Sequence, residues 1–409
     1  MKKLLLLLVL AGVVSSCRTD QVTELVYPRR IPSQIVPLDR DTIPFFDANT
    51  GLYAPIAGTI TKGRTMYVQS DLFVETGDSL ILEPGVKLIM LGNHAIYING
   101  TLISEGSKEK PVEITIDAIR KANPEFAQGG AWGGINVDSA KAMVLRWTKI
   151  EYAGGPDEGN SPRYAVKCIN DAIQPCIIED CWISYSFDDG MRFYGVKNLS
   201  VQRNHFIRNG GPEGEALNIQ KGVTGIIAYN VFVSSATNCM KVYTDATVLN
   251  PQTDIAIVNN TFVNTGYRRT QKTGNAILLD RWARARIYNN LFINCRQSLR
   301  ITNAVDKQNV HYGHNLFFAN IDNPTWQANT VNRFYPAGDF GSPQNTDLIN
   351  TDPIVELLET NFENIQNNNM APLISNVRLR LNSPARGTGN PNYDNDMGAY
   401  TSSLNSNQH

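Results

Sequence analysis

The sequence has little charge, few cysteines and few histidines. Only 18% of its 409 residues are Asp, Glu, Lys or Arg, and 37 basic residues face 38 acidic ones, for a formal net charge of −1. This balance lacks the basic excess that binds phosphate backbones, so we expect no nucleic acid as a partner. Six cysteines are too few for a fold built from disulfides. Of the five histidines only His311 and His314 have metal-ligand spacing, and because they lack a third ligand we interpret them as structural.

Long apolar runs are also absent, except near the N-terminus. Two lysines there precede an apolar run over residues 4–14, which is too short to span a bilayer and is typical of a secretory signal peptide. The run ends in Val14-Ser15-Ser16-Cys17, which resembles the bacterial lipoprotein signal, in which the cysteine becomes the lipidated first residue. We therefore expect residues 1–17 to be a signal peptide. The protein would be exported and anchored by lipid at Cys17 to the bacterial cell envelope, with the outer membrane favoured. The alternative is an ordinary signal peptide with a chance cysteine.

What the sequence does contain is a repeat of 25 to 30 residues, in which an apolar residue, two variable residues, Asn, one variable residue and an apolar residue recur. The segments alternate and are rich in β-branched and aromatic residues, so they are expected to be short strands. Such a repeat can wind into a coil in which each turn pairs only with the turns above and below it. Asn would then form a ladder at one corner. The copies are Val201–Phe206, Ile227–Phe232, Ile257–Phe262, Ile287–Phe292 and Tyr312–Phe317, with Ile178–Ile183 as an earlier copy that has Cys181 in the Asn place.

This pattern resembles the right-handed parallel β-helix, the pectate-lyase-like fold with an Asn ladder. Residues 77–89, 96–106, 110–115, 132–135 and 150–155 are similar to the opening of exported bacterial β-helix proteins, and residues 381–389 and 396–400 to their ending. The fold class expected is all-β, a single-stranded solenoid with an irregular C-terminal cap. Residues 18–55, with five prolines, are expected to be an extended tether, residues 56–317 the β-helix and residues 318–409 the cap. A local alternative is a hairpin at Asn99-Gly100.

The five cysteines after Cys17 are an odd number, so at least one thiol must stay free. We interpret Cys168 and Cys181 as small core residues. A bridge between Cys176 and Cys181 is an alternative.

One more strand is expected after each Phe strand, and alternation then fixes which residues point outward. The central outward column is predominantly basic and reads Lys167, Arg192, Asn218, Lys241, Leu278 and Arg300. The column beside it reads Ile169, Tyr194, Gln220, Tyr243, Asp280 and Thr302, and the column three residues upstream reads Tyr164, Asp189, Glu215, Asn238, Asn275 and Gln297.

Basic residues stacked at the strand spacing repel one another by about 1 kcal/mol per pair in water, and nearby anions relieve that repulsion. The anions could be Asp189 and Glu215, which gives a structural charge ladder. They could also belong to a bound acidic polysaccharide, with Lys167, Asn218 and Arg300 as binding residues and Tyr194 and Tyr243 offering faces for sugar rings. Three longer loops on the same side, at residues 154–162, 209–215 and 265–274, favour a site there.

Two cleavage chemistries fit. Glu213-Gly214-Glu215 resembles the calcium site of β-helix lyases of alginate and dermatan. That resemblance implies calcium held by Glu213 and Glu215, with Asp189 as a further ligand, Lys221 as the base, and Lys241 in the place of the family's Arg. Arg192 is a further candidate catalytic cation for the developing enolate. Paired carboxylates at Asp188, Asp189 and Glu215 would instead suit glycoside hydrolysis, which we rank below elimination. The non-catalytic alternative is a surface adhesin or structural β-helix protein.

Overall fold

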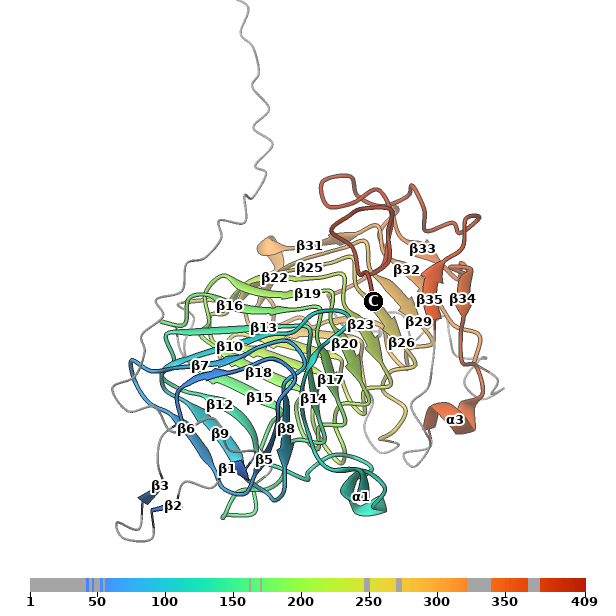
Figure 1. The fold of residues 1–409 in the computed structure, drawn as a ribbon. Coiled ribbons are helices and arrows are strands. Elements are labelled where there is room, and N and C mark those ends of the chain that lie inside the picture. The colour runs from blue at the N-terminus through green and yellow to red at the C-terminus, as the bar shows by residue number, and fades with distance from the viewer. Residues whose placement is uncertain are drawn as a thin grey trace, which may run out of the picture.

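The computed structural model describes residues 56–161, 163–169, 171–245, 251–269, 274–321, 340–366 and 376–409, together with three short strand segments before residue 56. The chain winds into a coil whose walls are three parallel sheets (Figure 1). Each full turn contributes one strand to each wall, in the order sheet 2, sheet 1, sheet 3. No helix among these residues is long and apolar enough to cross a membrane.

The bounds of the strands follow the coil. Sheet 1 contains β1 (Thr42–Ile43), β5 (Thr65–Val68), β8 (Lys87–Met90), β11 (Val112–Thr115), β14 (Thr148–Glu151), β17 (Trp182–Ser184), β20 (His205–Ile207), β23 (Val231–Val233), β26 (Thr261–Val263), β29 (Leu291–Ile293), β32 (Leu316–Phe318) and β33 (Leu348–Ile349). Sheet 2 contains β4 (Gly58–Ile60), β7 (Ser79–Leu82), β10 (Thr101–Glu105), β13 (Ala142–Arg146), β16 (Cys176–Glu179), β19 (Leu199–Gln202), β22 (Thr224–Ala228), β25 (Asp254–Val258), β28 (Arg284–Tyr288) and β31 (Val310–Gly313). Sheet 3 contains β6 (Leu72–Val74), β9 (Ala95–Ile98), β12 (Gly134–Val137), β15 (Val166–Ile169), β18 (Met191–Tyr194), β21 (Leu217–Gln220), β24 (Met240–Tyr243), β27 (Ile277–Asp280) and β30 (Leu299–Ile301).

Few elements lie outside these walls. Two antiparallel pairs join β2 (Phe46–Asp47) to β3 (Leu52–Tyr53) and β34 (Val355–Leu357) to β35 (Asn376–Leu379). The short helices are α1 (Ala118–Lys121), η1 (Pro124–Phe126), η2 (Lys307–Asn309) and α3 (Phe362–Gln366). The nearly all-β architecture predicted from the repeat is confirmed.

The Asn ladder forms at the corner between sheets 2 and 1. The side chain of Asn260 donates from Nδ2 to the backbone oxygen of Ile227 at 2.9 Å and to Oδ1 of Asn290 at 3.1 Å, and its own Oδ1 accepts from the side chain and backbone of Asn230. The left-handed corner, however, lies one residue earlier than the ladder. Asp180, Arg203, Tyr229, Asn259, Asn289 and His314 have φ between 51° and 58°. The ladder Asn therefore supplies hydrogen bonds inside the corner, and the residue before it adopts the left-handed backbone conformation of the turn.

The interior is a stack of identical columns. Phe206, Phe232, Phe262, Phe292 and Phe317 are fully buried and stack with ring centroids 4.8 to 5.1 Å apart. This distance is the spacing of paired strands, because each ring sits one turn above the next. All five cysteines of the described residues are buried and free, so the alternative bridge between Cys176 and Cys181 does not form.

The hairpin alternative fails near one end of the coil, and the irregular cap expected at the C-terminal end is present. Asn99 and Gly100 connect β9 of sheet 3 to β10 of sheet 2, so the hairpin alternative is wrong. At the other end β33 adds to β32, and the backbone of Phe340 bonds to Ile301, which closes the last turn. The remaining chain then returns along the outside of the coil, where Asn407 donates to the backbone of Tyr229. Cys17 and most of the expected tether lie outside the described residues.

Candidate functional site

The outer face of sheet 3 carries the columns expected from alternation. The register pairs Lys167 with Arg192, Arg192 with Asn218, Asn218 with Lys241, Lys241 with Leu278, and Leu278 with Arg300. The strand pattern of buried and half-buried residues places these side chains outward in most turns. The face lies on β15, β18, β21, β24, β27 and β30, of which Figure 1 labels β15 and β18.

Arg192 joins two of the columns. Its Nε donates to Oδ2 of Asp189 at 2.5 Å and its Nη1 donates to the hydroxyl of Tyr164 at 2.5 Å, while its guanidinium lies 3.9 Å from the centre of the Tyr164 ring. Asp189 is completely buried, and the Arg192 side chain retains 19% of its exposure. Asp189 therefore supplies the internal anion that a stacked basic column needs.

Asn218 and Glu215 extend this network by one turn. Asn218 donates from Nδ2 to Oδ2 of Asp189 at 3.0 Å and to Oε2 of Glu215 at 3.3 Å. Glu215 also accepts from Asn238 at 3.0 Å, and its backbone N–H donates to Oδ1 of Asp189 at 2.8 Å. Because one amide nitrogen reaches both carboxyl groups, Asp189 and Glu215 lie at hydrogen-bond range of a common point.

Burial of these acids changes their proton affinity. Loss of hydration, and then the charge of Asp189, raise the pKa of Glu215 to about 8; Lys241 opposes this. Loss of hydration and the neighbouring Asp189 likewise raise the pKa of Asp188 to about 7, against the opposing charge of Arg192. Two carboxyl groups thus hold protons near neutral pH beside the carboxylate paired with Arg192. We call Asp188, Asp189 and Glu215 the acid cluster.

Cations lie over the tyrosines of the second column. Lys221 lies 5.1 Å from the ring centre of Tyr194, and Lys241 lies 5.4 Å from that of Tyr243. Arg281 lies a further 5.4 Å from the Tyr243 ring. These rings are therefore cation-binding surfaces in the structure, and a sugar ring would have to displace a side chain in order to stack on them.

The structure brings together some of the expected site residues and separates others. Arg192, Asn218, Glu215 and Asp189 form one network, and Lys241 acts on Glu215. Lys221 instead turns outward: its side chain is half exposed and pairs with Asp245 at 3.7 Å. Lys167 pairs with Asp138 at 3.7 Å, and Arg300 lies at the far end of the column, four strands from Arg192.

Glu213, which the lyase resemblance assigns to calcium, pairs with a residue of another loop. Its two carboxylate oxygens receive hydrogen bonds from the guanidinium of Arg269. Among the described residues no group of three His, Cys, Asp or Glu side chains gathers to hold a metal. Calcium stays a prediction from the lyase resemblance.

The central column also extends further than the repeat predicted. Lys167 pairs with Asn136, Asn136 with Tyr97, and Tyr97 with Phe73, so three more strands share the face. The signal was present in the alternation of residues 72–74, 95–98 and 134–137, but these turns lack the Asn ladder that sets the register elsewhere.

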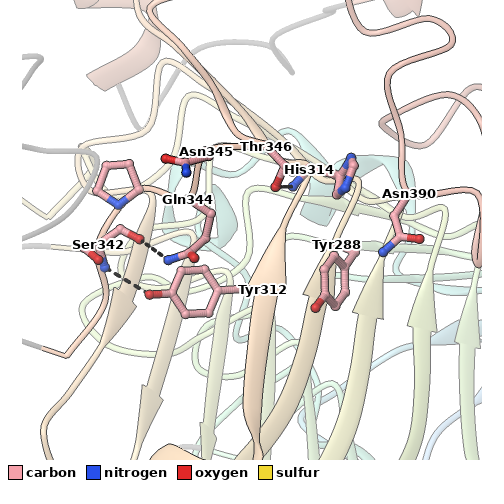
Figure 2. A pocket seen from close by; sticks show the side chains of 9 residues that line it. Tyr288, Tyr312, His314, Ser342, Gln344, Asn345, Thr346 and Asn390 are labelled. Carbon is pink, nitrogen blue, oxygen red and sulfur yellow. Dashed lines mark hydrogen bonds between the residues drawn. The ribbon is translucent and has the colours of Figure 1, made fainter.

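A pocket lies at the C-terminal end of the coil (Figure 2). This pocket of about 540 Å³ is lined by Tyr288, Tyr312, His314, Ser342, Pro343, Gln344, Asn345, Thr346 and Asn390. Gln344 donates to the backbone of Ser342 at 2.9 Å, and the backbone N–H of Ser342 donates to the Tyr312 hydroxyl at 3.1 Å. Its lining contains no Asp, Glu, Lys or Arg.

Fold and register together define a right-handed parallel β-helix with a polar site on one outer wall. Residues 133–317 match the family model described as "Right handed beta helix region". A similar solved structure is that of an alginate lyase from Paenibacillus sp. str. FPU-7, with 15% identity and a TM-score of 0.40 over 61% of this chain and 82% of that one. A likeness of this degree does not bear on activity. No curated protein matches the sequence.

Proposed function

We propose that the protein binds an acidic carbohydrate polymer along the outer face of sheet 3 and cleaves it at the acid cluster. The observation that carries this proposal is the meeting of Asp189 and Glu215 at one amide nitrogen of Asn218, beside Arg192 on the wall that carries the basic column. Burying Glu215 and Asp188 so that each keeps its proton to about neutral pH works against folding at higher pH. Acids held in this way on an outer wall are typical of functional sites rather than of a core.

The cluster has the parts needed for glycoside hydrolysis. A protonated carboxyl, Glu215 or Asp188, donates its proton to the glycosidic oxygen as the bond to the anomeric carbon breaks. The Asp189 carboxylate is completely buried and held by Arg192 and Asn218, so it stabilises the positive charge that develops on the sugar through space and without contact. Water adds to the anomeric carbon, and its proton passes to the carboxylate that the first step left ionised.

Elimination is the second candidate, and the position of Lys241 favours it. Lys241 lies close enough to Glu215 to oppose the rise in its pKa, so both groups can face a uronate carboxylate bound on β21 and β24. The protonated Glu215 and Asn218 would then hydrogen-bond the substrate carboxylate while a base removes the neighbouring proton. The half-exposed Lys221, the base implied by the lyase resemblance, is displaced toward Asp245, which weighs against it.

The test is to mix the purified protein with a panel of acidic and neutral polysaccharides, with and without calcium. Reducing ends and the ultraviolet absorbance of an unsaturated product are followed in parallel, and native-gel retardation reports binding. New reducing ends without the absorbance support hydrolysis, and both signals together support elimination. Either activity should disappear in Glu215→Ala and persist in Lys62→Ala, an exposed lysine outside the face. Retardation without cleavage would leave a binding protein, and no response to any polymer would overturn the proposal.

We also propose that Cys17 carries a lipid that anchors the protein to the cell envelope. The support is the sequence signal alone. Mass spectrometry of the N-terminal peptide should show acyl groups on Cys17, and Cys17→Ser should move the protein from the membrane to the soluble fraction. An unmodified cysteine in a mature N-terminal peptide would contradict this.

A further inference from the structure

A second pocket lies on the same wall as the acid cluster, three turns toward the N-terminus. It measures about 590 Å³ and is lined by Asp71, Asn93, His94, Tyr97, Pro156, Asp157, Glu158, Gly159 and Arg163. Tyr97 stands in the central column, in register with Asn136 and then Lys167. His94 stands three residues before Tyr97, as Asp189 stands three residues before Arg192. The pocket and the acid cluster therefore occupy the same two columns of sheet 3.

The pocket is built by contacts between segments far apart in the sequence. Arg163 donates from Nε to the backbone of Gly155 at 2.8 Å and from Nη2 to Oδ1 of Asn93 at 2.6 Å. Asn93 in turn donates to the backbone of Pro156 at 2.7 Å. These hydrogen bonds connect the long loop before β15 to the turn before β9. This loop, one of the three insertions in the repeat, forms a wall beside Tyr97.

Three carboxylates, those of Asp71, Asp157 and Glu158, line the pocket against the single guanidinium of Arg163, so it suits the hydroxyls of an uncharged sugar residue and not a uronate carboxylate. Tyr97 stacks on Phe73 with ring centroids 5.0 Å apart, which gives a rigid aromatic base. Asp71 accepts from the backbone of Ala95 at 2.8 Å, so its carboxylate is held beside His94. Burial, and then Arg120 and Arg163, lower the pKa of His94 against the opposing charge of Asp71, so the imidazole is neutral at pH 7 and can both donate and accept. The pocket therefore offers one aromatic surface and several fixed hydrogen-bonding groups.

One further polar group, the side chain of Asn136, indicates a ligand on the outer face between the pocket and the acid cluster. Asn136 lies between Tyr97 and Lys167 in the column, it is 8% exposed, and its Nδ2 is buried without a hydrogen-bond partner. A buried amide donor without a partner destabilises the fold, and a hydroxyl or ring oxygen of a bound polymer that reached it would recover this loss.

We propose that this pocket is a distal subsite for the carbohydrate polymer, which holds a sugar residue about three units from the acid cluster. Successive turns are separated by about 4.8 Å, close to the length of one sugar residue in an extended chain, so three turns correspond to three residues. The inference rests on the proposed function, because it uses the same polymer and the same wall. Residues 156–159 of the long loop form one side of this pocket.

The experiment measures binding against oligosaccharide length, with oligomers prepared from whichever polymer retards the wild-type protein. Calorimetry should show a step in affinity when the oligomer becomes long enough to span the cluster and the pocket. Tyr97→Ala and His94→Ala should each remove this step, about a tenfold loss for the longer oligomers, and leave the affinity of shorter ones unchanged. Tyr67→Ala is the matched control, because Tyr67 is 42% exposed on sheet 1 near the same end of the coil.

The outcomes separate the two proposals. If the wild type binds the polymer but Tyr97→Ala and His94→Ala bind every length as the wild type does, the subsite is wrong and the proposed function stands. If affinity rises smoothly with length and without a step, the subsite is also wrong. If no polymer is bound at all, the proposed function itself has failed. His94→Ala guards against loss of folding in Tyr97→Ala, since it leaves the stack on Phe73 intact.

Discussion

Arg192 donates a 2.5 Å hydrogen bond to the completely buried carboxylate of Asp189. This pair explains how a column of basic residues and a column of acidic residues coexist on adjacent strands. It also places one buried negative charge between Asp188 and Glu215, and that charge contributes to the raised pKa of both.

Removing the cation of this pair should be costly. In Arg192→Met the Asp189 carboxylate stays buried without its ion partner, and we expect a loss of about 3 to 5 kcal/mol in the free energy of unfolding. Lys167→Met is the matched control in the next turn, because Lys167 pairs with a half-exposed Asp138, and its loss should stay below about 1 kcal/mol. Denaturant unfolding followed by circular dichroism measures both, and equal losses would argue against the special role of the Arg192 pair.

The pH dependence of the free energy of unfolding should show the contribution of Glu215. Its pKa in the folded protein, about 8, is above the ordinary value of 4.5, so the folded state holds the proton after the unfolded state has lost it. Its contribution to stability is therefore fully present below about pH 4.5 and is lost as the pH rises toward 8. Glu215→Gln cannot ionise, so the variant should gain stability relative to the wild type as the pH rises from 5 to 8.

The measurement is the melting temperature of both proteins across that range. The difference between them is used because His205 acts in the opposite direction. Burial lowers the pKa of His205 to about 3, so its contribution is present above pH 6.5 and is lost as the pH falls toward 3. Parallel melting profiles for wild type and Glu215→Gln would show that Glu215 keeps an ordinary pKa.

The Asn ladder should be sensitive to a single apolar substitution. Asn260→Leu would remove the donors to Ile227 and Asn290 and the acceptor for Asn230, all of them buried. We expect a loss of about 3 kcal/mol or more, since each orphaned buried group costs about 1 to 3 kcal/mol. The companion change Cys181→Asn places an amide at the start of the ladder, where the backbone of Cys181 already bonds to Asn204. It should be much less harmful, and a similar loss in both variants would contradict this account.

The cost of truncating a side chain to Ala should depend on how deeply that side chain is buried, as the phenylalanine stack can show. Phe232→Ala removes a fully buried ring between Phe206 and Phe262, and we expect a cost of about 3 to 5 kcal/mol. Leu404→Ala removes a side chain that is 95% exposed and should change stability by less than about 0.5 kcal/mol. Thermal unfolding of the two variants tests this. A small effect of Phe232→Ala would mean that the stack collapses to fill the space.

The sequence by itself determined the coil, its ladder and the register of its outer columns. These features repeat every 25 to 30 residues, so each turn reports the same alternation and the pattern fixes which side chains share a column. The alternation correctly predicted that Lys167, Arg192, Asn218 and Lys241 share one column, because strand pairing between neighbouring turns leaves little freedom of register.

Only the tertiary structure decided which of those side chains meet. Glu213 and Glu215 are two residues apart, yet one faces Arg269 and the other joins Asp189, because the loops that carry Glu213 and Arg269 pack against each other. The repeat also could not place Tyr97 on the same face, since its turn lacks the Asn that marks the corner. Contacts between loops depend on the packing of segments distant in sequence, and a local period carries no information about them.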